Sequence, residues 1–375
     1  MADAPPDRWK GVAGVALALV VGTAGGWAAS VAGIPLPWML GSMGACLAAV
    51  LASAPVERPK RVVEPMRMVL GVMLGSTLTP ELLERAGEMA VSVALLVPYV
   101  AVAALVGWLY FARLCRLDRE TAFFAAMPGG VFTMTAYAED IGADVRQVAL
   151  IQSARIILVV STLPFVIRWL ADADMASASL LPGGPMSDIA LQDAALLIAA
   201  GLVGWIAARA VRVPGAAIVG PMVASAALHL AGITAVQPPG LFVIAAQVVL
   251  GAAIGTRFTG SSPAQIGRTI WMSTGFVLAM LVLTAATAYG AHLLTGIHPF
   301  AGVLAYAPGG LTEMSLVALG LGFNVGYVAT LHFLRILLIA LVAPIFFRLL
   351  GGGPISDLVA RKRAREAAGR TTEEA

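Results

Sequence analysis

Two arginines lie in the middle of otherwise apolar stretches of the chain, Arg155 in IQSARIILVV and Arg335 in LHFLRILLIA. Each follows a polar residue by three positions, Gln152 in the first stretch and His332 in the second, which puts both side chains of a pair on one helical face. A guanidinium group binds a carboxylate or a phosphate through two parallel hydrogen bonds. We therefore expect these pairs either to bind an anionic solute or to hold a carboxylate or a backbone carbonyl group in place, and the sequence favours neither alternative.

A Pro-Gly-Gly motif interrupts the apolar region upstream of each arginine. The backbone groups that such a break frees are costly in lipid unless protein covers them or a ligand binds them. The helix that follows the break also presents free N–H donors to an anion. One alternative is that the motif has no other role than to turn a hairpin. We predict instead that its residues bind substrate: Pro128, Gly129, Gly130, Pro308, Gly309 and Gly310.

The residues that follow the two motifs differ at one position, where Thr133 corresponds to Glu313. Both are candidates for the substrate site. A carboxylate inside a membrane is costly unless it is protonated or paired. Glu313 is therefore expected to carry a proton, to coordinate a cation or to form an ion pair with an arginine.

These motifs belong to an internal duplication. AAMPGGVFTM (125–134) recurs as AYAPGGLTEM (305–314), and VLGVMLGSTLT (69–79) recurs as VLGAAIGTRFT (249–259), both 180 residues later. A nearly constant offset indicates two copies of one structural unit. We assign the first membrane repeat to residues 10–170 and the second to residues 191–350. Residues 171–190 are the predicted linker, and residues 351–375 are the predicted cytoplasmic tail.

Composition predicts an all-α polytopic membrane protein. Hydrophobic residues make up 59% of the 375 residues and charged residues only 12%, against roughly 25% charged in soluble domains. The net charge of +3 argues against nucleic acid as a partner. No set of histidines, thiols or carboxylates has metal-ligand spacing, and no nucleotide-binding or nucleophile motif occurs, so we expect no metal, no cofactor and no enzymatic activity.

Apolar runs of about the length that spans a bilayer occur five times in each repeat. A further segment in each repeat, 120–140 or 299–321, is divided by Pro-Gly-Gly and is expected to turn back rather than to cross. The predicted crossings lie at 10–30, 34–54, 66–79, 88–112 and 147–170, and at 191–210, 215–233, 240–257, 267–291 and 325–349.

The distribution of arginine and lysine predicts how the repeats are oriented. Cytoplasmic loops collect these residues. Basic residues follow the second and fourth segments of the first repeat but the first and third segments of the second. Five crossings and one re-entrant segment per repeat, in inverted topology, put nearly all of them on one face. We therefore predict a multi-pass protein of the bacterial inner membrane with both termini in the cytoplasm.

Three stretches resemble one family: PWMLGSMGACLAA, MPGGVFTMTAYAEDIGADVRQVALIQSARI and APGGLTEMSLVALGLGFNVGYVATLHFLRI. They are similar to the bacterial AbrB membrane proteins, which carry the same duplication and are often labelled ammonia monooxygenases. The resemblance covers roughly residues 12–350. It implies an inner-membrane protein of a group catalogued as regulators of gene expression, distinct from the small DNA-binding regulators of the same name. It brings no known catalytic or ligand residues.

Two functions fit these residues. The leading hypothesis is a secondary transporter-like protein for a small anionic solute, with the lipid bilayer as its environment and any effect on gene expression indirect. The alternative is a membrane-embedded sensor that regulates gene expression through a cytoplasmic partner. Ammonia oxidation needs a metal, usually copper, for which the chain has no ligand cluster. The sequence leaves the solute, the coupling ion and a homo-oligomeric state open.

Overall fold

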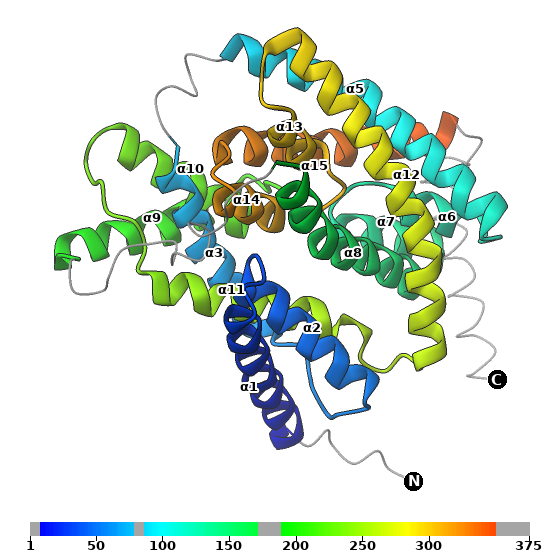
Figure 1. Ribbon diagram of the computed structural model, residues 1–375, viewed down its shortest axis with the longest axis horizontal. Coiled ribbons are helices and arrows are strands. Elements are labelled where there is room, and N and C mark those ends of the chain that lie inside the picture. The colour runs from blue at the N-terminus through cyan, green and yellow to red at the C-terminus, as the bar shows by residue number, and fades with distance from the viewer. Residues whose placement is uncertain (1–7, 79–85, 172–188, 350–375) are drawn as a thin grey trace, which may run out of the picture. The chain divides into compact units, whose positions relative to one another are not determined.

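The structure, a computed structural model, describes residues 8–78, 86–171 and 189–349 (Figure 1). Within these ranges every regular element is helical. The first part of the chain forms α1 (Arg8–Val31), α2 (Pro37–Leu51), α3 (Lys60–Ser76), α5 (Ala86–Leu109), η1 (Tyr110–Leu114), α6 (Arg119–Ala126), α7 (Val131–Ile141) and α8 (Val145–Ala171). The second forms α9 (Leu191–Ala210), α10 (Ala216–Leu230), α11 (Gly240–Gly255), η4 (Thr256–Phe258), α12 (Pro263–Thr295), α13 (Pro299–Tyr306), α14 (Leu311–Gly320) and α15 (Val325–Leu349).

All ten predicted segments contain a helix, and both Pro-Gly-Gly segments are divided into two short helices. The largest boundary difference is at α3, which starts at Lys60 instead of residue 66. The first turns of α3 contain the charged residues Lys60, Arg61 and Glu64, so the apolar pattern of the sequence begins only after them. The predicted tail and all but the ends of the predicted linker lie outside the described residues.

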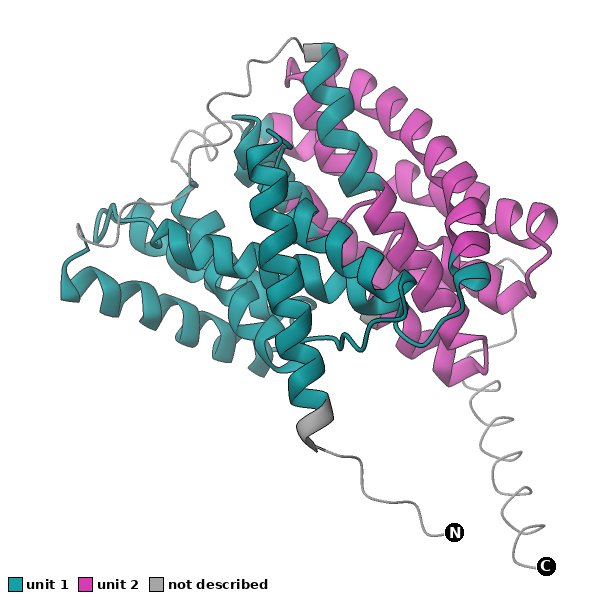
Figure 2. Cartoon of the chain, turned by 60° about the horizontal axis from the view of Figure 1, so that its bottom comes forward, with its two compact units in different colours: residues 1–87, 159–266, 311–329 teal, residues 88–158, 267–310, 330–375 magenta. Residues whose placement is uncertain are grey.

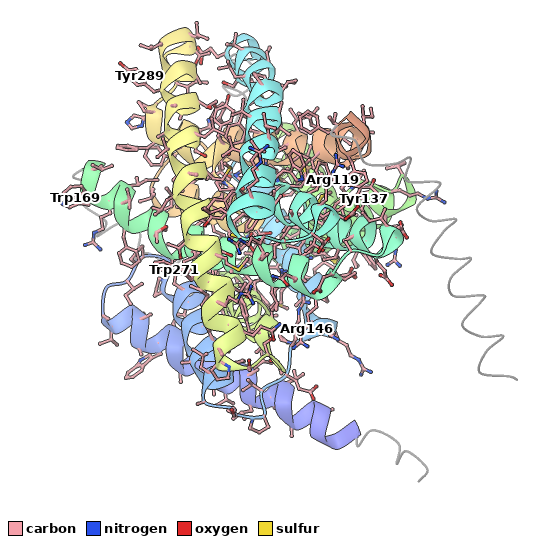
Figure 3. The ribbon with its side chains drawn as sticks, turned by 90° about the vertical axis from the view of Figure 1, so that its right-hand side faces the viewer. Arg119, Tyr137, Arg146, Trp169, Trp271 and Tyr289 are labelled. Atoms are coloured by element: carbon pink, nitrogen blue, oxygen red, sulfur yellow. The ribbon has the colours of Figure 1, made fainter. Side chains whose placement is uncertain are left out.

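Seven of the described helices are long and apolar enough to cross a membrane. They are α1, α5, α8, α9, α11, α12 and α15, some with short extensions. Helices α2, α3 and α10 occupy the other three predicted crossings and have only 15 to 17 residues. Large apolar side chains point outward from several of the long helices, as in α9 with Ile198 62% and Val203 62% exposed. On α12, Trp271 and Tyr289 are also at the surface (Figure 3). These exposed side chains are typical of a lipid-facing surface.

The chain divides into two compact units, and each unit contains parts of both sequence repeats (Figure 2). Unit 1 comprises residues 1–87, 159–266 and 311–329, and unit 2 comprises residues 88–158, 267–310 and 330–375. The predicted repeats at 10–170 and 191–350 therefore do not coincide with the compact units.

In unit 1, glycines allow helices of the two repeats to pack closely, with their backbones in contact. A methyl group on Gly71 of α3 would lie 2.5 Å from the carbonyl oxygen of Ile218, and one on Gly75 would overlap the next turn of α10. Gly251 and Gly255 of α11 meet α2 at Met39 and Met43 in the same way. The contact points advance together along both chains, so α3 runs parallel to α10, and α11 runs parallel to α2. These two contacts are reciprocal, because each joins the third helix of one repeat to the second helix of the other.

In unit 2, α5 and α12 pack in opposite directions. Tyr99 Oη and Thr284 Oγ1 are 3.1 Å apart, and Tyr110 Oη donates to the carbonyl oxygen of Met272 at 2.9 Å. Residue numbers rise along α5 and η1 while those of their partners fall along α12. Helices α5 and α12 occupy corresponding positions in the duplicated sequence.

Side-chain caps start corresponding helices at corresponding residues. Asp144 Oδ1 accepts from the N–H of Gln147 at 2.9 Å, and Asn324 Oδ1 accepts from the N–H of Tyr327 at the same distance. Such caps satisfy N–H groups that a helix leaves without partners. The caps fix where α8 and α15 begin, so Arg155 and Arg335 lie at the same position along their respective helices.

Candidate anion site beside the Pro-Gly-Gly segments

The first Pro-Gly-Gly segment folds back on itself within unit 2. The rings of Phe124 in α6 and Tyr137 in α7 are 6.3 Å apart. Beyond α7, the N–H of Asp144 donates to Thr121 Oγ1 at 2.9 Å, so the end of α7 returns to the start of α6. Gly142 ends α7 and allows the chain to turn toward α8, because its φ of 80° lies in the left-handed region. Residues 127–130 therefore form the tip of a helical hairpin, as the sequence predicted.

The second segment is divided between the two units, because α13 belongs to unit 2 and α14 to unit 1. Burial is the same at both motifs. The proline and first glycine of each are buried and the second glycine is half-buried, which applies to Pro128, Gly129, Gly130, Pro308, Gly309 and Gly310.

Gln152 and Arg155 of α8 both contact the C-terminal end of α6. Gln152 Nε2 donates to the carbonyl oxygen of Phe124 at 2.7 Å and to that of Met127 at 3.4 Å. Arg155 Nη1 donates to the same carbonyl oxygen of Met127 at 3.0 Å. The last carbonyl groups of a helix have no partner within it and carry its negative dipole end, so a cation is favoured there.

His332 and Arg335 of α15 make the corresponding contacts with α13. His332 Nε2 lies 2.8 Å from the carbonyl oxygen of Leu304, which is the counterpart of Phe124. Arg335 Nη2 is 3.0 Å from His332 Nδ1, an arrangement that requires the proton of the neutral imidazole on Nε2. Arg335 donates from Nη1 to Tyr306 and Ala307 and from Nη2 to Gly309 at 2.8 Å, in each case to the carbonyl oxygen. Of the two roles that the sequence left open, holding a backbone carbonyl is the one these contacts display.

The two arginines bring positive charge into the interior of unit 2. Arg155 and Arg335 are each 2% exposed, and their guanidinium groups repel each other electrostatically. Among the described residues, no carboxylate interacts electrostatically with either of them. Hydrogen bonds to carbonyl groups stabilise a guanidinium group but do not neutralise it. The site is therefore a buried, doubly cationic one.

Two tyrosines that the sequence analysis did not select complete this region of unit 2. Tyr99 interacts electrostatically with both arginines and packs against Tyr306 with ring centroids 5.5 Å apart. Tyr306 Oη donates to the carbonyl oxygen of Ser92 at 2.7 Å. A phenol within an apolar run is a detectable signal, but only the fold shows that these two phenols lie beside the arginines.

Glu313 and Thr133 belong to different units. In unit 1, Glu313 is 9% exposed, lies in the first turn of α14 and interacts electrostatically with Arg257. Arg58 and Arg67 act on Arg257 as well. Burial, and then the charge of Arg67, lowers the pKa of Arg58 below its ordinary value. Of the three roles expected for Glu313, pairing with an arginine is the one with a partner among the described residues.

Thr133 is half-buried in α7 of unit 2. Among the described residues, no three histidines, cysteines or acidic side chains gather where they could hold a metal ion.

Comparison with known proteins agrees with the resemblance seen in the motifs. The family model described as "Transition state regulatory protein AbrB" matches residues 38–351. The chain is 29% identical over 357 residues to the uncharacterized protein YhjN of Bacillus subtilis (strain 168), an alignment covering 88% of this chain and 92% of that protein. It is 26% identical over 318 residues to a protein of Escherichia coli (strain K12) whose name, AbrB, labels it a regulator, with 84% and 90% covered. Because the family model spans most of the chain, including both Pro-Gly-Gly motifs and both buried arginines, this helical membrane protein belongs to the AbrB family.

Proposed function

We propose that the protein is a secondary transporter-like membrane protein for a small anionic solute, which binds beside Arg155 and Arg335. The observation that carries this proposal is the buried charge of these two residues, each 2% exposed and neither interacting with a described carboxylate. Buried cations are strongly unfavourable unless an anion compensates them. An anionic solute supplies that charge, and any effect on gene expression is then indirect.

An inverted arrangement of the two repeats is part of the proposal, because secondary transporters often bind substrate where broken helices of inverted repeats converge. The antiparallel packing of α5 with its counterpart α12 supports it. So do the parallel contacts of α3 with α10 and of α11 with α2. If the repeats had the same orientation, these contacts would require α2 and α3 to be parallel although only residues 52–59 connect them.

A contact between two loops of unit 1 supports the same orientation. Thr259 Oγ1 donates to the carbonyl oxygen of Val56 at 3.5 Å, and Arg257 interacts electrostatically with Arg58. The loop after the second segment of the first repeat thus lies beside the loop after the third segment of the second repeat. Inversion places both on one side of the membrane. Their arginines would make that side the cytoplasmic face of a bacterial inner membrane.

Transport can be tested with the purified protein in proteoliposomes. Uptake of radiolabelled small carboxylates and of phosphate would be measured under an imposed proton or sodium gradient, with protein-free liposomes as the blank. We expect uptake by the wild type and its loss in Arg155→Ala and Arg335→Ala. Arg209→Ala is the matched control, because Arg209 is exposed and lies over the ring of Trp205 at 5.3 Å.

Two outcomes would change the conclusion. Uptake that Arg155→Ala leaves at the wild-type rate would contradict the proposed site. Arginine-dependent binding of an anion without flux would instead favour the sensor that regulates through a cytoplasmic partner.

A further inference from the structure

The two arginine sites differ in how many hydrogen-bond donors the protein itself occupies. Arg335 uses both terminal nitrogens, on the carbonyl oxygens of Tyr306, Ala307 and Gly309 and on Nδ1 of His332. Arg155 uses Nη1 alone, on the carbonyl oxygen of Met127. Neither Nε nor Nη2 of Arg155 donates to a residue that the structure describes. The duplication thus provides one guanidinium group in which both terminal nitrogens donate to the protein and Nε alone does not, and one in which only Nη1 does.

The spare donors of Arg155 have a defined geometry. Nε and Nη2 lie on one edge of the planar guanidinium group, and their two N–H bonds point in parallel. That edge is the fork that binds both oxygens of a carboxylate. Arg335 has no complete fork of this kind, because its Nη2 already donates to Gly309 at 2.8 Å.

Gln152 adds an unused acceptor at the same place. Its Nε2 faces the carbonyl oxygens of Phe124 and Met127, which can only accept, so the orientation of the amide is determined. Oε1 is buried and has no hydrogen-bond partner among the described residues. Gln152 and Arg155 share the carbonyl oxygen of Met127, so their polar ends lie close together. In the second repeat both nitrogens of His332 have partners.

We propose that Arg155 and Gln152 bind a small carboxylate that carries a hydrogen-bond donor beside the carboxylate group, as a 2-hydroxycarboxylate does. This proposal rests on the function proposed above and specifies its substrate class. The carboxylate accepts from Nε and Nη2 of Arg155, and the hydroxyl group donates to Oε1 of Gln152. Arg335 and His332 are positioning residues that hold α13 and the 307–310 segment through their carbonyl groups.

Access to this site requires movement of the first tip. Nε of Arg155 and Oε1 of Gln152 are sealed from water in this arrangement. Arg155 holds the 127–130 segment by one carbonyl group, whereas Arg335 holds the 307–310 segment and the end of α13 by three. The first tip is therefore the more easily displaced, and its displacement opens the unused donors and acceptor to the ligand.

The test compares glycolate with acetate, which differ by the hydroxyl group. Affinities are measured from the shift of the unfolding temperature of the purified protein in nanodiscs, with sodium chloride at equal ionic strength as the reference. We expect the wild type to bind glycolate about 3- to 10-fold more tightly than acetate, as one hydrogen bond contributes. Gln152→Leu should remove this preference. Arg155→Lys, which keeps the charge but loses the fork, should weaken both anions roughly 10- to 100-fold.

The second repeat supplies the matched controls. His332→Gln and Arg335→Lys should lower the unfolding temperature without ligand but retain the preference for glycolate. The inference fails if the wild type does not prefer glycolate, if Arg155→Lys keeps wild-type affinity, or if Arg335→Lys alone abolishes binding. Should phosphate or sulfate bind through Arg155 without any preference for glycolate, the proposed function stands and this inference fails. If none of these anions binds, both fail.

Discussion

Replacing Arg335 by alanine should destabilise the protein more than replacing Arg155. Arg335 donates to three carbonyl groups at the end of α13 and in the 307–310 segment, whereas Arg155 donates to one at the end of α6, a difference of two carbonyl bonds. A hydrogen bond from a charged donor contributes about 1.5–3 kcal/mol, so the two additional carbonyl bonds alone should make the two substitutions differ by about 3–6 kcal/mol. The bond from Arg335 to Nδ1 of His332 increases this difference. Comparing the variants with each other cancels the relief from removing a buried cation, since both side chains are 2% exposed. Gln152 also keeps a bond to the carbonyl oxygen of Met127 when Arg155 is removed.

The assay is unfolding in mixed micelles of a mild detergent and increasing dodecyl sulfate, followed by circular dichroism at the helix band. Arg209→Ala, at an exposed position, should change the free energy of unfolding by less than about 0.5 kcal/mol. Equal destabilisation by the two buried substitutions would refute the reasoning, and a larger loss for Arg155→Ala would do so more clearly. Either result would mean that the carbonyl contacts do not determine the stability of the tips.

Three further predictions concern packing, backbone conformation and charge. Gly75→Ala should lower the unfolding temperature, because the added methyl group overlaps α10. Gly44→Ala is the control: no atom lies within 4 Å of the added methyl group, so it should leave the unfolding temperature unchanged or raise it slightly. Gly142→Ala should reduce stability by about 1–2 kcal/mol and Gly142→Asn by less, because φ is 80° there; equal losses in the micelle assay would exclude this cause. Glu313→Gln should lower the free energy of unfolding by more than the roughly 1 kcal/mol of an exposed ion pair and less than the roughly 3–5 kcal/mol of a buried one. A double-mutant cycle with Arg257→Gln should show coupling between the two side chains, and additive losses would contradict their interaction.

The sequence was sufficient to predict most of the helices and the breaks between them. Segments 191–210 and 325–349 match α9 and α15 residue for residue, because apolar runs bounded by polar residues have little alternative in lipid. Glycine recurs at 142 and 322 with the offset of the duplication, and the structure gives both residues a positive φ at the turn after α7 or α14. The length of α2 could not be predicted, since the helix covers only 15 residues of a 21-residue apolar stretch.

The tertiary structure alone decided how the repeats are combined and which groups remain available. The duplication is a property of the linear sequence, so a constant offset of 180 residues revealed it and also paired Arg155 with Arg335. Membership of a compact unit depends on contacts between distant segments, and these placed Glu313 in unit 1 and both arginines in unit 2. The difference between the arginines is a matter of which carbonyl groups lie within 3.5 Å of which nitrogens. Two nearly identical motifs can differ in this respect because hydrogen bonding depends on tenths of an ångström in space, whereas sequence patterns specify only residue type and spacing.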